Sequence, residues 1–362
     1  MKFNVCVLLL FVILVLTIPA AGNTNIKTNE KQNDNEYAIS TAESTPLPAK
    51  NEISARTSAE YYSPVWEVVR HDEYDGEFRI YNQSTGKVER INYKDYVRGA
   101  ICAEMSPEFH PEALKAQGVA ALTYALYNQK MHRGKDIPAL HGADFAADPL
   151  NWKGFVTKEI AKDRYGEKFD IYWSKICNAA DEASQKIIIY DDAPILAAYH
   201  STSSGITEAA ENVWNHSLPY LTPVSSRGDL LAPGYETELT LSVQQFKEIA
   251  LNSISNLTLG SEPNDWIEVL DRSEGGYVTS VRVGNQIIHG KKFRSILQLR
   301  SSNFTITCDG KNFYLTVYGY GHGVGLSQYG ADFMAMQGSS SDEILCYYFT
   351  GAKIVSADEY IK

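Results

Sequence analysis

Apolar and polar residues alternate along several short stretches of the chain, and each stretch predicts a β-strand. Residues 77–82 (EFRIYN) and 87–93 (KVERINY) follow this pattern, and Gln83–Gly86 between them has the residue types of a hairpin turn. Another strand is predicted just before them, at residues 65–70 (VWEVVR). Further strands are predicted in the second half of the chain, at residues 266–273, 277–284, 285–290, 303–308 and 313–321.

The pattern changes at Pro111, where residues 111–130 (PEALKAQGVAALTYALYNQK) predict a helix with proline in its first turn. Small residues crowd this helix at Ala113, Ala116, Gly118, Ala120, Ala121 and Ala125. Because small side chains allow close approach, we expect the helix to be central and buried. A β-hairpin is predicted around Asp191 and Asp192, and another helix at residues 242–254.

The C-terminal part predicts two short helices after a glycine-rich loop. The first ends at Gly338, and Ser340 and Glu343 have capping-box spacing for the second, which ends near Gly351. Strands and helices are mixed without a strand–helix–strand rhythm. The predicted fold class is therefore α+β, with a mixed β-sheet core around the central small-residue-rich helix.

The beginning of the chain predicts a targeting segment. Lys2 precedes an uncharged apolar run, which is typical of a signal peptide or, as we prefer, of a membrane anchor at residues 1–22. Residues 23–60 are polar and almost free of aromatic residues, which predicts a disordered stalk. Residues 61–362 then form a single extracytoplasmic domain, within which residues 231–308 are a predicted subdomain. We therefore expect the protein at the cell membrane, held by a single N-terminal anchor.

Charge and cysteine content narrow the possible functions. The formal net charge of −11 argues against binding of nucleic acid, which needs clustered Lys and Arg. After the apolar run the cysteines are Cys102, Cys177, Cys308 and Cys346, and no CxxC pair occurs, which excludes a zinc ribbon. Two disulfides are possible, but four buried free thiols are the interpretation we prefer. The apolar surroundings of Cys102 indicate an inert thiol rather than a nucleophile.

Glu104, in the run AICAEM, is the first candidate for chemistry. Its neighbours Ile101, Ala103 and Met105 are apolar, and desolvation raises the pKa of a carboxyl group. A carboxylic acid that keeps its proton near neutral pH can act as general acid on a glycosidic oxygen. The alternative is a capping or surface glutamate beside a proline turn.

A second candidate is the stretch 199–205 (YHSTSSG). The hydroxyl groups of Ser201 and Ser203 suit sugar hydroxyl or acetamido groups, and His200 is placed to orient a carboxylate. No G-x-S-x-G frame occurs here, which argues against a serine hydrolase. An ordinary polar turn is the alternative interpretation.

A third candidate is the glycine-spaced loop 319–330 (GYGHGVGLSQYG). Without a strand–helix–strand unit around it, this loop does not fit a dinucleotide cradle. We interpret the glycines as positions of close backbone approach beneath a cleft, with His322 and Gln328 facing inward. A lone histidine is more often structural than catalytic.

Taken together, the motifs resemble the stage II sporulation protein D family of peptidoglycan lytic transglycosylases. The matching stretches are YVRGAICAEM, PEALKAQGVAALTYAL, YHSTSSGITEAAENVW followed by PYL, FRSILQLRSSNF and GYGHGVGLSQYGADFMA, in the family's order. The resemblance covers roughly residues 65 to 355. It places the catalytic glutamate of the family on Glu104.

The resemblance implies cleavage of the bond between N-acetylmuramic acid and N-acetylglucosamine. Glu104 first protonates the glycosidic oxygen and then takes a proton from the C6 hydroxyl of the muramic residue, which leaves a 1,6-anhydro end and consumes no water. The residues implied to line the glycan cleft are His200, Ser201, Ser203, His322 and Gln328. The implied partners are peptide-free glycan strands, an amidase that first removes stem peptides, and the membrane scaffold of the engulfment machinery.

Two departures from the family pattern bear on cofactor and activity. Many clostridial members have a His/Cys zinc site after the central helix, but here His141 is the one plausible ligand in that stretch, so no zinc or other cofactor is expected. The central helix of the family usually carries Arg where this chain has Leu122. Related proteins with the same fold stimulate amidases, so a non-enzymatic amidase enhancer is the alternative function.

Overall fold

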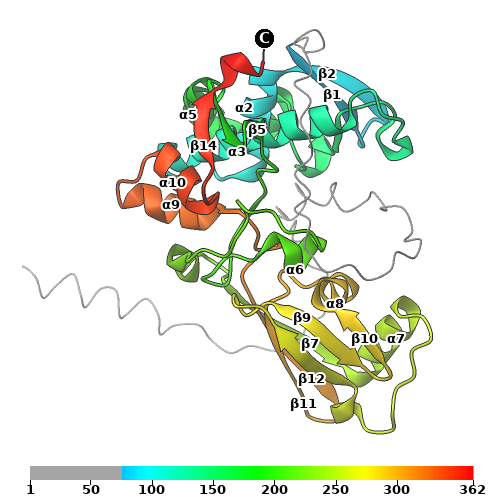
Figure 1. Cartoon of the computed structure of the whole chain (residues 1–362). Coiled ribbons are helices and arrows are strands. Elements are labelled where there is room, and N and C mark those ends of the chain that lie inside the picture. The colour runs from blue at the N-terminus through cyan, green and yellow to red at the C-terminus, as the bar shows by residue number, and fades with distance from the viewer. Residues whose placement is uncertain (1–75, 362) are drawn as a thin grey trace, which may run out of the picture. The chain divides into compact units, whose positions relative to one another are not determined.

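The computed structural model describes residues 76–361. The predicted anchor (1–22), stalk (23–60) and strand at 65–70 lie outside the described residues. No helix within 76–361 has both the length and the apolar character needed to cross a membrane. Helices and strands are mixed along the described chain, as the predicted α+β class requires (Figure 1).

The N-terminal elements form a small sheet followed by helices. Strands β1 (Glu77–Asn82) and β2 (Lys87–Asn92) pair as the predicted hairpin, and β3 (Phe145–Ala147) pairs in parallel with β1. Four helices belong to this part of the chain: α2 (Tyr93–Glu104), α3 (Pro111–His132), α4 (Lys158–Tyr165) and α5 (Phe169–Ala183).

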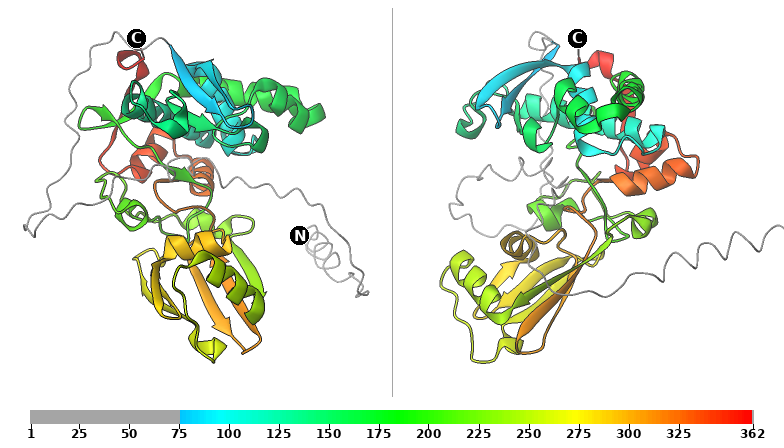
Figure 2. Two further views of the ribbon diagram at one scale, coloured as in Figure 1. Left: turned by 90° about the vertical axis from the view of Figure 1, so that its right-hand side faces the viewer. Right: turned by 180° about the vertical axis from the view of Figure 1, so that it is seen from behind.

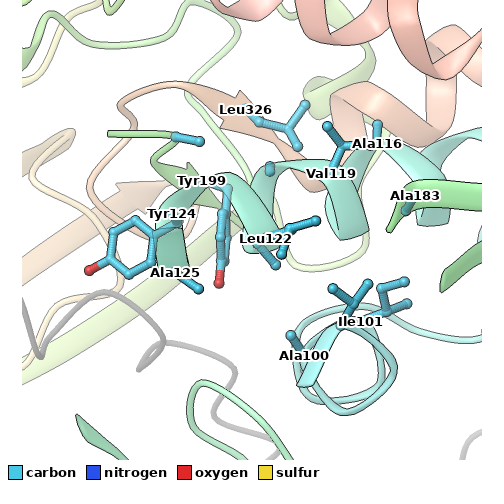
Figure 3. Close-up of a cluster of buried hydrophobic side chains, with 14 of the residues drawn as sticks. Ala100, Ile101, Ala116, Val119, Leu122, Tyr124, Ala125, Ala183, Tyr199 and Leu326 are labelled. Carbon is cyan, nitrogen blue, oxygen red and sulfur yellow. The ribbon is translucent and has the colours of Figure 1, made fainter. Parts of the chain in front are cut away.

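The predicted central helix is α3, with Pro111 in its first turn. Its small residues are buried and pack against α2 and α5, so the expected close approach is confirmed. Figure 3 shows side chains of α2 and α3 in one buried cluster with Ala183, Tyr199 and Leu326. The apolar pattern of α3 therefore reflects burial on nearly every side rather than along one stripe.

Short strands bring distant parts of the chain against this helical core. The hairpin predicted around Asp191 and Asp192 is formed by β4 (Lys186–Tyr190) and β5 (Ala193–Pro194), and both turn residues have positive φ. Strand β14 (Lys353–Ser356) pairs on the other edge of β4. Strand β6 (Tyr199–His200) pairs in parallel with β13 (Leu326–Ser327), which joins two of the predicted motifs.

A second hydrophobic core lies within residues 236–318. One antiparallel sheet has the order β11-β12-β7 and another the order β10-β9-β8. The strand bounds are β7 (Glu236–Ser242), β8 (Ile267–Arg272), β9 (Val278–Val283), β10 (Gln286–His289), β11 (Phe304–Cys308) and β12 (Asn312–Tyr318). Helices α7 (Val243–Ser253) and α8 (Gly290–Leu297) lie against these strands (Figure 2). The central strand β12 lies beyond the end of the predicted subdomain, residues 231–308.

Three further helices complete the described chain. Helix α6 (Ala210–Trp214) follows the β6 motif, and α9 (Gln328–Met336) and α10 (Ser341–Tyr348) are the two predicted C-terminal helices. The capping box of α10 forms as predicted, because Ser340 and Glu343 exchange hydrogen bonds with each other's backbone N–H.

Candidate active site

Glu104 is the last residue of α2. The helix begins at Tyr93, where the side chain of Asn92 accepts a hydrogen bond from the backbone N–H of Lys94, and the chain becomes extended at Met105. Close packing fixes the helix laterally, because a β-carbon added at Gly99 would lie 2.3 Å from the carbonyl oxygen of Val156. Glu104 therefore lies in the core at the end of this helix, and the residue is 3% exposed.

Burial raises the pKa of Glu104 to about 8. Hydrogen bonds from the backbone N–H of Gly154 and from the side chain of Gln328 act in the opposite direction, because they stabilise the carboxylate. Tyr96 and Tyr199 interact electrostatically with Glu104, and burial raises the pKa of both tyrosines, so both stay neutral. At neutral pH the folded protein therefore holds Glu104 mainly as a protonated acid.

The Gln328 side chain is the group of the glycine-spaced loop that reaches Glu104. Gln328 is the first residue of α9, directly after Ser327, whose hydroxyl caps that helix. Its side-chain amide also donates a hydrogen bond to Oε1 of Gln117 on α3, at 3.3 Å. Two residues predicted from separate motifs, Glu104 and Gln328, are thus brought into contact.

His200 and His322 form a second group. Their ring centroids lie 5.6 Å apart. Nδ1 of His200 donates to the carbonyl oxygen of Val324 at 3.1 Å, while Nδ1 of His322 accepts from the backbone N–H of Val324 at 2.9 Å. Burial lowers the pKa of His200 to about 4 and the pKa of His322 well below its usual value. Both rings are neutral at neutral pH.

His322 also lines a small cavity of about 20 Å³. Lys291 and Arg294 from α8 line the same cavity, and both positive charges help to lower the pKa of His322. The carboxylate of Glu208, another lining residue, already accepts hydrogen bonds from Ala209 and Asn212. Lys291 and Arg294 outnumber the single carboxylate of Glu208 in this lining, so the cavity is positively charged, which suits a small anionic substituent.

Of the two predicted serines, Ser203 holds the turn through its side chain and Ser201 through its backbone. The backbone N–H of Ser203 donates to Oδ2 of Asp229 at 2.8 Å, its hydroxyl donates to the same oxygen, and the residue is fully buried. The carbonyl oxygen of Ser201 accepts from the backbone N–H of Tyr329 at 3.1 Å. Ser203 thus differs from the expected glycan contact, because its hydroxyl is engaged inside the protein.

The structure places both departures from the family pattern, Leu122 and the stretch around His141. Leu122 is fully buried in the apolar core around α3, as Figure 3 shows. Within the described residues, no group of three or more His, Cys, Asp or Glu side chains is arranged to hold a metal ion. The ring of His141 packs on Tyr81, 4.5 Å between centroids.

The described cysteines are free thiols. Burial raises the pKa of Cys102 to about 11, which fits the inert thiol expected at that position. Cys102 is buried, but Cys177 and Cys308 are half-buried and Cys346 is exposed, so the prediction of four buried thiols is wrong.

Several residues of the site were not found by inspection of the sequence. Gly154, Gln117 and Asp229 each contact a predicted site residue. Gly154 and Asp229 lie outside the stretches that the motifs singled out, and Gln117 lies in the predicted central helix without having been proposed as a site residue. The one sequence feature that marks Gly154 is the glycine itself. Gly154 has a φ of +80°, which glycine adopts readily, and this turn directs its N–H at Glu104. The contacts of Gln117 and Asp229 depend on the pairing of β6 with β13 and could not be read from the sequence.

Fold and site define an α+β protein in which loops from distant parts of the chain surround one buried carboxylic acid. The chain matches the family model described as "Stage II sporulation protein" over residues 81–190. It is 33% identical over 283 residues to stage II sporulation protein D of Bacillus amyloliquefaciens, which covers 78% of this chain and 79% of that protein. The chain therefore belongs to the stage II sporulation protein D family, as the motifs indicated.

Two further relatives come from Bacillus subtilis (strain 168). Its stage II sporulation protein D is 31% identical over 283 residues, covering 78% of this chain and 80% of that protein. Its amidase enhancer is 28% identical over 316 residues, covering 72% of this chain and 40% of that protein. The similarity thus extends from the sporulation proteins to a longer protein named for its effect on an amidase.

Proposed function

We propose that the protein is a peptidoglycan lytic transglycosylase that acts on peptide-free glycan strands during sporulation. The observation that carries this proposal is the state of Glu104: a buried carboxyl group with a pKa of about 8, held by two hydrogen bonds. A pKa near the working pH lets one group donate a proton and later accept one. Ordinary hydrolysing glycosidases divide these tasks between two carboxyl groups.

The reaction proceeds in two halves, and its protons balance. Protonated Glu104 donates its proton to the oxygen that links N-acetylmuramic acid to N-acetylglucosamine, and the bond from C1 to that oxygen breaks. The Glu104 carboxylate then removes the proton of the C6 hydroxyl of the muramic residue while the C6 oxygen forms a bond to C1. The products are a 1,6-anhydromuramoyl end and a free N-acetylglucosamine end, and Glu104 has regained its proton.

The remaining site residues have supporting roles in this proposal. Gln328 and Gly154 hold the carboxyl group, and the cavity beside His200 and His322 accepts polar substituents of the glycan. The protein works at the cell membrane with its domain on the extracytoplasmic side, held by the N-terminal segment. Its partners there are an amidase and the membrane scaffold of the engulfment machinery, and no cofactor is needed.

The proposal is tested by incubating the full-length chain with purified peptide-free glycan strands and analysing the products by mass spectrometry. We expect 1,6-anhydro ends from the wild type. Glu104→Gln keeps the shape of the side chain but carries no proton to donate, so cleavage should fall by at least ~10²-fold. The exposed Glu211 supplies the control, since Glu211→Gln should cleave normally. No 1,6-anhydro ends from the wild type at high protein concentration, or wild-type cleavage by Glu104→Gln, would contradict the proposal.

The second candidate function is a non-enzymatic enhancer of a cell-wall amidase. One observation favours it: Glu104 is 3% exposed, as a structural glutamate would be. Leu122, at the position where the resemblance implies Arg, agrees with this alternative. The similarity to an amidase enhancer gives this alternative a precedent. It predicts that the wild type and Glu104→Gln stimulate an added amidase equally and that neither produces 1,6-anhydro ends.

A further inference from the structure

Asp229 joins the two loops that flank the candidate active site. It lies in the short helix η5 (Arg227–Leu231) and is fully buried. Its Oδ2 accepts the backbone N–H of Ser203 at 2.8 Å, and its Oδ1 accepts the hydroxyl of Ser327 at 2.6 Å. One carboxylate therefore links the turn after β6 to Ser327, the N-cap of α9.

Ser327 in turn fixes the first turn of α9. Its hydroxyl oxygen accepts the backbone N–H of Gly330 at 3.3 Å. A β-carbon added at Gly330 would lie 2.0 Å from the hydroxyl oxygen of Tyr348 and 2.2 Å from Oγ of Ser226, so the helix is pressed against its surroundings. The start of α9, and with it Gln328, is therefore held in one place.

The amide of Gln328 acts as a donor in both of its contacts. A carboxylate has no proton to give, so the hydrogen bond that stabilises ionised Glu104 must come from the amide N–H of Gln328. The amide nitrogen also donates to Oε1 of Gln117, which fixes the orientation of the amide group. An amide has two N–H groups, so both bonds can form together.

We propose that Gln328 is a positioning residue for the carboxyl group of Glu104, and that Asp229 holds Gln328 in place through Ser327. This inference rests on the proposed function of Glu104. The hydrogen bonds from Gly154 and Gln328 oppose the desolvation of the carboxylate, because each donates an N–H to it. Tyr96 and Tyr199 are neutral and supply no charge. Without Gln328 the carboxyl group would keep its proton more tightly, and the step in which Glu104 accepts the C6 proton would slow.

The test measures the protonation of Glu104 directly, by NMR titration of the full-length chain labelled with ¹³C at the glutamate carboxyl groups. The Glu104 signal is assigned by its absence in Glu104→Gln. Gln328→Leu removes the donor at similar volume and should raise the pKa of Glu104 by about one. The alkaline limb of the cleavage rate should move upward equally, and kcat should fall more than KM rises.

Ser327→Ala tests the link to Asp229, and Ser340→Ala is its matched control, because Ser340 caps α10 in the same way. We expect Ser327→Ala to raise the pKa of Glu104 and Ser340→Ala to leave it unchanged. Should Gln328→Leu fail to fold, this pair decides the question. A folded Gln328→Leu or Ser327→Ala in which Glu104 titrates as in the wild type overturns the inference. A shifted titration together with a wild type that makes no 1,6-anhydro ends would instead refute the proposed function alone.

Discussion

His200 and His322 bind the backbone of one residue from opposite directions. His200 donates to the carbonyl oxygen of Val324, and His322 accepts from its N–H. The bond from His200 needs a proton on Nδ1, whereas His322 can accept only while its Nδ1 carries no proton. The ring centroids are 5.6 Å apart. Protonation of both rings would place two positive charges close together in a buried site, which makes the pair sensitive to acid.

This relationship predicts a loss of stability at low pH. The pKa of His200 is about 4 in the folded protein and 6.5 in an unperturbed histidine, so the unfolded chain binds more protons between these values. The contribution of His200 to the free energy of unfolding should therefore fall as pH drops from 6.5 to 4, by up to roughly 3 kcal/mol. His200→Gln removes this contribution, so urea unfolding curves measured at pH 4.5 and 7 should show that the variant gains stability at pH 4.5 relative to the wild type. His216→Gln, at an exposed position, should keep this contribution; equal slopes in the two variants would contradict the prediction.

Glu104 predicts the opposite pH dependence. Its carboxyl group keeps a proton up to a pKa of about 8 in the folded protein but releases it near pH 4.5 when unfolded. At Glu104 the folded state therefore binds more protons in this window, and the contribution of Glu104 to stability falls as pH rises through it. Glu104→Gln should abolish this loss and exceed the wild type by roughly 3 kcal/mol at pH 7. Urea unfolding at pH 5, 7 and 8 measures the difference, and parallel curves for the two proteins would refute a buried, protonated Glu104.

The lack of zinc ligands in the stretch after the central helix predicts that the purified protein contains no stoichiometric zinc. His141 is the one plausible ligand in the stretch after the central helix, and a structural zinc site needs about four ligands. Elemental analysis of protein purified without chelators should give well below one zinc per chain. A stoichiometric content that disappears in His141→Ala would show that ligands were misplaced, and His132 and Cys177 would be the first to re-examine.

The sequence predicted well those features that depend on neighbours along the chain. Pro111 at the start of α3, the capping box of α10 and the desolvation of Glu104 all follow from local residue types. Prediction was weaker where a role depends on tertiary contact. Ser203 has the residue type of a glycan ligand, yet the fold places Asp229 beside it and engages its hydroxyl.

Long-range pairing explains most of what could not be predicted. The contact between Glu104 and Gln328 requires α9 to start where β13 pairs with β6. Nothing in the local sequence around Gln117 distinguishes it from other polar residues of a helix that is buried on nearly every side. Such partners are set by how the elements pack, so the candidate acid was predictable while its hydrogen-bonding neighbours were not.

The close packing of α3 gives a final prediction, on Gly118. A β-carbon added there would lie 2.7 Å from Cβ of Ala183 and 2.8 Å from Cδ1 of Ile101. Ile101 can change rotamer, but the β-carbon of Ala183 moves only with α5, so Gly118→Ala should cost about 1–3 kcal/mol of stability. Because Ile101 and Glu104 share α2, the displacement should also reduce cleavage.

Gly260 supplies the matched control for Gly118, because no atom lies within 4 Å of a β-carbon added there. Gly260→Ala should be neutral or slightly stabilising, since alanine restricts the unfolded chain more than glycine does. Urea unfolding of the two variants beside the wild type measures the contrast. If Gly118→Ala proved as stable as Gly260→Ala, the contact between α3 and α5 would be looser than these distances imply, and α2 would not be fixed by it.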